Sequence, residues 1–250
     1  MIMSDFENWA SGFSGCDGGD IGTPESRSTW VCGIEWGGGH DLDALKQSIS
    51  NQVVSPPLGY DDVLQSTDCI FNRQTMKLIT AMQGLKVEEY EKMSLQQRPF
   101  VKGTSGFFKM NLFPISFKDT AHQRWQKSFN EVTGFANKEE YLAWCRRVRF
   151  EQMRFWVSTY KPKVIICFGK TLITDYALAF AGQGSKFTSE KILNRDLSWT
   201  RTVDDVLIAI CPFPVNRYGL NSNALLQGFG DRIRTLMAVN FQDSAQPNNL

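Results

Sequence analysis

The chain has 250 residues, of which 42% are hydrophobic and 21% charged, as in a folded protein of one or two domains and unlike a disordered chain. Lysine and arginine total 27 and aspartate and glutamate total 26, so the formal net charge of +1 excludes a generic polycation that coats nucleic acid. It does not exclude an enzyme that acts on nucleic acid, because a local patch can make the phosphate contacts.

The sequence alternates between predicted strands and predicted helices. The first 28 residues are rich in glycine, serine and aspartate, so we expect a loop-rich arm there. Four short apolar runs are typical of buried strands: 30–35, 107–116, 163–170 and 206–214. Apolar residues at helical spacing predict helices after Asp41 and over 73–83, 87–93, 139–160, 171–180 and 223–239. This order predicts an α/β fold, a three-layer α/β/α sandwich with a central four-stranded, mostly parallel sheet, in a single domain over 1–250 with a disordered tail at 242–250.

The cysteines give no sign of a metal site. There are six of them, none in a Cys-x-x-Cys pair, and the two histidines add no zinc-ligand spacing. We therefore expect no metal or cofactor and a reducing, cytoplasmic setting. Residues 1–10 contain acids and no apolar stretch, and no apolar run approaches the roughly 18 residues that span a bilayer. We expect neither a signal peptide nor a membrane partner.

Ligands of parallel α/β sheets bind at the carboxyl ends of the strands, so the residues there are the candidates for a site. Glu35 follows the first strand, next to three glycines whose backbone can approach a ligand closely: Gly37, Gly38 and Gly39. Asn111 ends the apolar part of the second strand, and a fixed amide can read the edge of a planar ligand. Phe107 and Phe108 precede it and could stack on such a ligand. The alternatives are structural: a capping acid, a buried amide and core rings.

The last two strands are followed by a cation and by a stiff loop. Gly169 and Lys170 begin a helix, which suits either a phosphate contact or a plain turn. The loop after the fourth strand could insert a wedge into a duplex or could be a rigid connector; its residues are Pro212, Pro214, Val215, Asn216, Arg217 and Tyr218. Four arginines could add phosphate contacts or form a solvated helix face: Arg146, Arg147, Arg149 and Arg154.

In their order, these motifs resemble those of the uracil-DNA glycosylase superfamily. Gly-Ile-Glu-Trp-Gly over 33–37 is similar to the superfamily's water-activating motif and places Glu35 at the catalytic position. Asn111 matches the base-reading asparagine, and Gly169 with Lys170 matches the loop that binds the DNA backbone. Cys-Pro-Phe-Pro-Val-Asn-Arg over 211–217 is similar to the last motif and its minor-groove wedge. The resemblance spans residues 30 to about 226.

Three departures from the family pattern concern the base pocket. Trp36 replaces the proline of the first motif, and Cys211 stands where many members have a histidine that stabilises the departing base. Gly37 falls where the best-known branch has a tyrosine that excludes bulky bases, which implies a roomier pocket. By the resemblance, six residues line this pocket: Ile34, Trp36, Gly37, Phe107, Phe108 and Cys211.

The resemblance implies a monofunctional DNA glycosylase that flips a base out of single- or double-stranded DNA and leaves an abasic site. Glu35 and Asn111 would be its catalytic residues, and the protein would act as a monomer. The target would be a uracil-like base or a bulky modified pyrimidine such as glucosylated hydroxymethylcytosine of phage DNA, so the role is base excision in repair or antiviral defence. The alternatives are a module that binds a modified base without cutting, and a nucleoside hydrolase.

Overall fold

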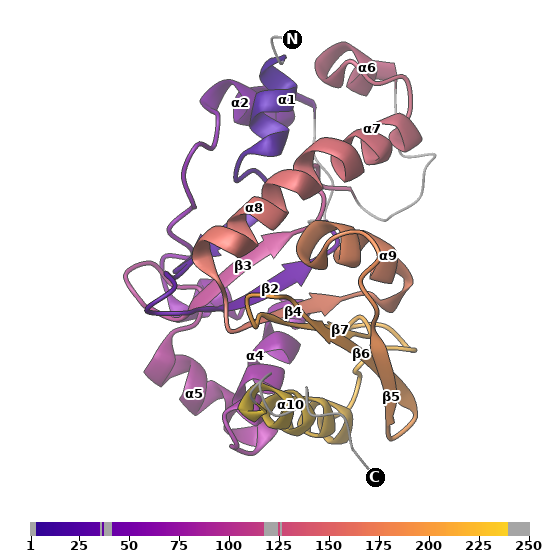
Figure 1. The fold of residues 1–250 in the computed structure, drawn as a ribbon. Helices are drawn as coiled ribbons and strands as arrows, with labels where there is room; N and C mark the ends of the chain where they lie inside the picture. The colour runs from indigo at the N-terminus through magenta and orange to yellow at the C-terminus, as the bar shows by residue number, and fades with distance from the viewer. Residues whose placement is uncertain (1–3, 36, 38–41, 118–124, 126, 240–250) are drawn as a thin grey trace.

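A mixed sheet of seven strands forms the centre of the computed structural model, which describes residues 4–35, 37, 42–117, 125 and 127–239 (Figure 1). The strands are β1 (Cys16–Gly19), β2 (Thr29–Gly33), β3 (Phe107–Asn111), β4 (Val164–Phe168), β5 (Thr188–Ile192), β6 (Arg195–Arg201) and β7 (Leu207–Cys211). The α-helices are α1 (Asp5–Ser11), α2 (Leu42–Asn51), α3 (Val63–Ser66), α4 (Ile70–Met82), α5 (Tyr90–Gln97), α6 (Lys127–Thr133), α7 (Lys138–Trp144), α8 (Phe150–Tyr160), α9 (Ile173–Tyr176) and α10 (Asn223–Ala238). Short 3-10 or π turns are η1 (Val87–Glu89), η3 (Cys145–Arg149), η4 (Lys170–Leu172) and η5 (Ala177–Ala181).

The predicted strands form the parallel centre of the sheet. In the strand order β1-β3-β2-β4-β7-β6-β5, the four strands from β3 to β7 are parallel to one another. Every residue of β4 and β7 is buried, as expected of parallel strands covered on both faces. The α/β class is confirmed, but the prediction of four strands is wrong. Three further strands pair antiparallel at the edges, β1 against β3, and β6 against β7 with β5 beyond it.

The edge strands lack the apolar runs that mark the central ones. β5 and β6 form a hairpin of largely polar residues, most of them exposed or half-buried. β1 has the sequence Cys-Asp-Gly-Gly, and Gly18 and Gly19 both have positive φ angles. A strand with one solvated face, or with two glycines, contains few consecutive apolar residues. A search for apolar runs therefore does not identify β1, β5 or β6.

Helices cover both faces of the sheet (Figure 1). Because side chains alternate along a strand, Trp30 and Cys32 of β2 enter one core while Val31 enters the other. The first core contains side chains of α1, α7, α8 and α9, and the second contains side chains of α4, α5 and α10. The sheet therefore lies between two helical layers, in agreement with the predicted sandwich.

The N-terminal segment is part of the folded core, so the prediction of a loop-rich arm over residues 1–28 is wrong for Asp5–Ser11 and Cys16–Gly19, which form α1 and β1, while the other described residues up to 28 form turns and loops. Ser4 caps α1 by accepting a hydrogen bond from the Glu7 amide, and Glu7 accepts one from the Ser4 amide in return. Trp9 is 1% exposed, and its indole N–H donates to Ser48 Oγ on α2 at 3.1 Å. The predicted disordered tail at 242–250 lies outside the described residues. In the part of the chain that the structure describes, no helix has the length and hydrophobicity needed to cross a membrane.

Arg149 joins the N-terminal segment to the end of β3. The predicted helix over 139–160 is continuous through α7, the π turn η3 and α8, and Arg149 is the last residue of that turn. Its guanidinium is fully buried and donates hydrogen bonds to five backbone carbonyls, those of Ala10, Gly12, Ser14, Asn111 and Leu112. Arg149 therefore fixes two segments that meet at the candidate site.

Candidate functional site

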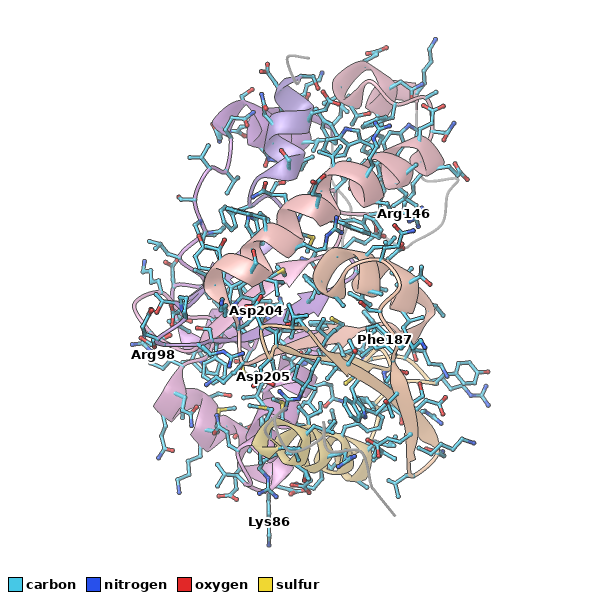
Figure 2. All side chains as sticks on the ribbon, viewed as in Figure 1. Lys86, Arg98, Arg146, Phe187, Asp204 and Asp205 are labelled. Carbon is cyan, nitrogen blue, oxygen red and sulfur yellow. The ribbon has the colours of Figure 1, made fainter. Side chains whose placement is uncertain are left out.

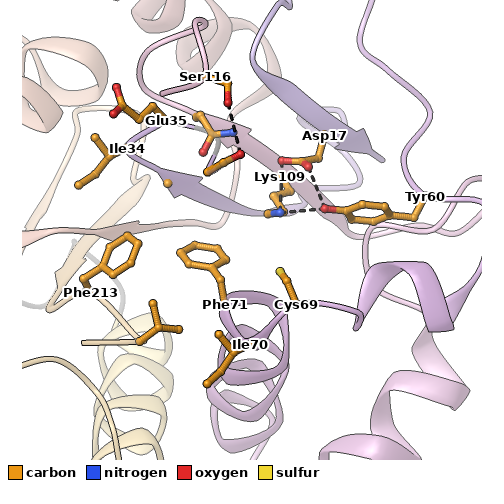
Figure 3. A pocket seen from close by; sticks show the side chains of 14 residues that line it. Asp17, Ile34, Glu35, Tyr60, Cys69, Ile70, Phe71, Lys109, Ser116 and Phe213 are labelled. Carbon is orange, nitrogen blue, oxygen red and sulfur yellow. Dashed lines mark hydrogen bonds and ion pairs between the residues drawn. The ribbon is translucent and has the colours of Figure 1, made fainter. Parts of the chain in front are cut away.

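A cavity of about 690 Å³ opens at the carboxyl ends of β2 and β3, beside the first turn of α4 (Figure 3). Its lining is Asp17, Gly33, Ile34, Glu35, Gly37, Tyr60, Cys69, Ile70, Phe71, Lys109, Asn111, Ser116, Phe213 and Val215. Both predicted catalytic residues, Glu35 and Asn111, are among them. The position agrees with the rule that ligands of parallel sheets bind at the carboxyl ends of the strands.

Strand register places the amide of Asn111 against Gly33. The two residues are partners in the parallel pair of β2 and β3. Asn111 is 4% exposed, and its Nδ2 donates to the Gly15 carbonyl at 3.0 Å, which fixes the orientation of the amide. A Cβ atom on Gly33 would lie 2.5 Å from Asn111 Oδ1, so only glycine leaves room for the amide in this position.

We expect Gly33→Ala to force the Asn111 amide out of its place and to destabilise the fold by about 1–3 kcal/mol, because an added methyl group in a packed site must displace its neighbour. Urea unfolding measures the cost, and the side-chain amide signals of Asn111 in a ¹H–¹⁵N spectrum report its displacement. Gly37→Ala is the matched control, since a Cβ atom there meets nothing within 4 Å. Unchanged Asn111 signals in Gly33→Ala would contradict this account.

Glu35 lies in a buried ion pair. Its side chain is 6% exposed, and Oε2 is 3.5 Å from Nζ of Lys138, which is 2% exposed at the start of α7. The same ammonium lies 4.0 Å from the centre of the Phe117 ring. A buried charge is tolerated when an opposite charge balances it, so Lys138 supports a carboxylate at the edge of the cavity.

A second polar group on the cavity wall was missed by the sequence analysis. Lys109 Nζ lies 3.3 Å from a carboxylate oxygen of Asp17 and donates to the Tyr60 hydroxyl at 2.8 Å, and that hydroxyl donates to Asp17 at 2.8 Å (Figure 3). Burial lowers the pKa of Lys109, but Asp17 and Tyr60 outweigh it and leave the pKa above its ordinary value, so the amine stays charged. Burial raises the pKa of Tyr60, so its hydroxyl keeps its proton.

The sequence did contain one signal for this group. Lys109 is a charged residue in the middle of an apolar strand, two positions before Asn111 and hence on the same face of β3. A buried lysine needs a charged or polar partner, and the position of Lys109 indicates that this partner lies on the same side of β3 as Asn111. Asp17 and Tyr60 could not be identified in the same way, because they come from β1 and from a loop before α3.

Besides Tyr60, the aromatic residues of the cavity lining are Phe71 and Phe213, whose ring centroids are 5.6 Å apart. The predicted pocket rings lie elsewhere. Phe108 is fully buried on the opposite face of β3, with its ring 5.8 Å from that of Trp30. Phe107 shares a face with Asn111 but lies at the other end of the strand, where it lines a separate cavity of about 300 Å³. The prediction that these two rings line the site is therefore wrong, since alternation and strand length separate them from it.

Cys211 does not line the cavity either. It is the last residue of β7, fully buried in the core that contains α10 side chains, and burial raises the pKa of its thiol so that the thiol stays neutral. Its assignment to the base pocket is wrong because β2 and β4 lie between β7 and β3, so that Cys211 faces the core on the same side of the sheet as Asn111 but away from the cavity. All six cysteines fall within the described residues, and all are free thiols.

The loop after β7 reaches the cavity through Phe213 and Val215. Pro212 and Pro214 are buried, and the tip of the loop, Asn216, Arg217 and Tyr218, is exposed. The Asn216 side chain accepts a hydrogen bond from the Tyr218 amide at 3.0 Å, which closes the turn. The loop thus lies beside the cavity with its tip exposed, while its predicted stiffness stays a prediction.

Most of the predicted phosphate-binding cations have other partners. Lys170 lies outside the cavity lining and pairs with Asp196 of β6 at 3.2 Å, while Gly169 has a φ of +122° at the turn before it. Arg146, which is labelled in Figure 2, pairs with Asp175 at 2.7 Å, and Arg154 donates to the Leu178 carbonyl. With Arg149 buried, the expected arginine patch is largely structural. Ile34 and Gly37 line the cavity as predicted, whereas Trp36, Gly38 and Gly39 lie outside the described residues.

No protein-family model matches the sequence, and a search of curated proteins also finds no match. Among the described residues, histidine, cysteine, aspartate and glutamate form no group of three or more that could hold a metal ion. What the site can do must therefore be argued from its own residues: a buried carboxylate, a fixed amide, two rings and a buried ion pair with a phenol.

Proposed function

We propose that the protein is a monofunctional DNA glycosylase, which hydrolyses the N-glycosidic bond of a flipped-out pyrimidine and leaves an abasic site. The observation that carries the proposal is that Glu35 and Asn111, from the ends of neighbouring parallel strands, line one cavity together with the ring of Phe71. In this proposal Glu35 acts on the sugar, Asn111 binds the edge of the base, and the Phe71 ring contacts the face of the base.

Each group has a distinct part in the reaction. Phe71 would stack on the extruded base, and Asn111 would bind its edge through Oδ1 and the Nδ2 proton that Gly15 does not use. As the bond to the base breaks, positive charge develops on the sugar, and the Glu35 carboxylate would stabilise it and orient the attacking water. The base leaves with the bonding electron pair, the water oxygen forms the new bond to the sugar carbon, and the proton that the water loses passes through Glu35 to the released base or to solvent. No metal or cofactor enters the reaction as written. Lys138 would keep Glu35 in place.

The cavity size bears on the choice of base. A volume of about 690 Å³ exceeds what a bare pyrimidine ring fills, and Gly37 at the rim adds no side chain. This supports a bulky modified pyrimidine, such as glucosylated hydroxymethylcytosine in phage DNA, alongside a uracil-like base. The loop around Val215 would fill the gap that the flipped base leaves in a duplex. In this proposal the protein acts on DNA as a cytoplasmic monomer, in repair or in antiviral defence.

The proposal is tested by base release from a panel of oligonucleotides that carry uracil, a thymine mismatch, hydroxymethylcytosine or glucosylated hydroxymethylcytosine, each single- and double-stranded. We expect at least one base to be released, seen as alkali-sensitive abasic sites and as the mass of the freed base. The matching free nucleosides are included, because release from them but not from DNA would make the protein a nucleoside hydrolase. Binding without release from any substrate would make it a non-catalytic module, and neither binding nor release would refute a role on DNA.

A further inference from the structure

The group of Asp17, Tyr60 and Lys109 forms a polar wall of the cavity, which lies across it from Glu35 (Figure 3). The three residues come from β1, from the segment before α3 and from β3. The side chains of Lys109 and Asp17 are 8% and 13% exposed, and what exposure they retain is towards the cavity that they line.

Stability of the fold does not account for this polar wall. A buried ion pair contributes little to stability compared with apolar side chains of the same volume, because removal of both charges from water offsets their attraction. Other residues on this face of the sheet, such as Val31 and Ile166, are apolar. A charged pair where this face borders the cavity of Glu35 and Asn111 therefore points to a ligand.

The hydrogen bonds of the wall define what it can bind. The Tyr60 hydroxyl is saturated, since it donates to Asp17 and accepts from Lys109 and from Asn72 Nδ2 at 3.2 Å. Lys109 has three N–H groups, and Asp17 and Tyr60 account for two of them among the described residues. A carboxylate can accept up to about four hydrogen bonds, so Asp17 can accept one from a ligand in addition to these contacts. The wall thus offers a donor and an acceptor side by side.

The charge of the wall selects among ligands. Its ammonium and carboxylate balance, so Asp17 repels a phosphate or carboxylate and Lys109 repels a cation. A hydroxyl group fits both, because it can accept from Lys109 and donate to Asp17. The rings of Tyr60 and Phe71, with centroids 5.4 and 5.5 Å from Lys109 Nζ, provide apolar surfaces for the carbon atoms that bear such a hydroxyl.

We propose that Asp17, Tyr60 and Lys109 form a second subsite, which binds a neutral, hydroxyl-bearing substituent of the target base while Glu35 and Asn111 act at the sugar and at the base edge. The subsite rests on the proposed function, since it takes the ligand of the same cavity to be a base. It assigns the choice between plain and modified bases to three residues that take no part in bond cleavage.

The test compares thymine with 5-hydroxymethyluracil at the same position of one duplex, because these bases differ by a single hydroxyl group. We expect the wild type to bind and to process the hydroxylated base at least tenfold better. Tyr60→Phe, which keeps the ring, and Asp17→Asn, which keeps the shape, should each reduce that preference to less than threefold. Lys102→Met is the control, since its exposed ion pair with Asp61 adjoins Tyr60 in sequence but lies outside the cavity lining.

Two readouts separate the subsite from the proposed function. Fluorescence anisotropy measures the affinity for each duplex, and base release measures the chemistry. Preferential binding of the hydroxylated duplex with no release would support the subsite and overturn the glycosylase. Equal affinity and equal release for both bases, or a preference that survives in Tyr60→Phe and Asp17→Asn, would overturn the subsite alone. Thermal unfolding identifies any variant that has lost its fold. If either Tyr60→Phe or Asp17→Asn is unfolded, the preference measured with the other variant tests the subsite.

Discussion

The Glu35→Gln variant is expected to release the target base at least about a hundredfold more slowly than the wild type while it binds DNA with similar affinity. The amide keeps the size of the side chain but removes the negative charge, which the proposed mechanism needs once positive charge develops on the sugar. Single-turnover base release measures the loss, and anisotropy with labelled DNA measures binding. Glu151→Gln, an exposed glutamate of α8, is the control and should leave both unchanged.

The same variant also has a stability cost that must be separated from the catalytic effect. Lys138 is 2% exposed, and the substitution removes the carboxylate 3.5 Å away that balances its charge. Loss of one member of a buried ion pair destabilises a protein by about 3–5 kcal/mol. Lys138→Met in the Glu35→Gln background should recover part of that stability and none of the base release. Full activity of Glu35→Gln on every substrate would refute the role given to Glu35.

The second large effect is expected from Arg149→Met, which should lower the free energy of unfolding by more than about 3 kcal/mol. The substitution leaves five buried carbonyls without the guanidinium that binds them, and each buried acceptor that loses its partner costs about 1–3 kcal/mol. Urea unfolding at equilibrium measures the change.

A matched control for Arg149 lies two residues away. Arg147 belongs to the same π turn but is exposed, so Arg147→Met should change stability by less than about 0.5 kcal/mol. A similar loss in both variants would show that the turn itself, and not the bound carbonyls, determines the effect. A loss below about 1 kcal/mol in Arg149→Met would contradict the account of the buried network.

The centre of the fold could be predicted from sequence because hydrophobic burial marks it directly. The runs that become β4 and β7 are apolar at every position, and Glu35 and Asn111 could be chosen because they stand where such strands end. The hairpin of β5 and β6 could not, because its residues are largely polar and its pairing depends on β7.

The site was predicted in part, and the errors concern where each side chain lies on the sheet. Phe108 was assigned to the pocket because it is close to Asn111 in sequence, yet three positions along a strand place the two side chains on opposite faces. Phe71 and Tyr60 line the pocket because α4 and the segment before α3 pack against the sheet. Such contacts between distant segments have no local sequence signal, so only the structure shows them.

The N-terminal segment has a consequence for how the protein is prepared. The Gly15 carbonyl holds the Asn111 amide, Asp17 belongs to the polar wall, and the carbonyls of Ala10, Gly12 and Ser14 accept hydrogen bonds from Arg149. A shortened version that begins at the first central strand would keep Glu35 and Asn111 and the parallel sheet, yet it would lack the parts that hold them in register. Activity lost on trimming residues 1–28 would therefore report on the architecture of the cavity and not on the chemistry of its two central residues.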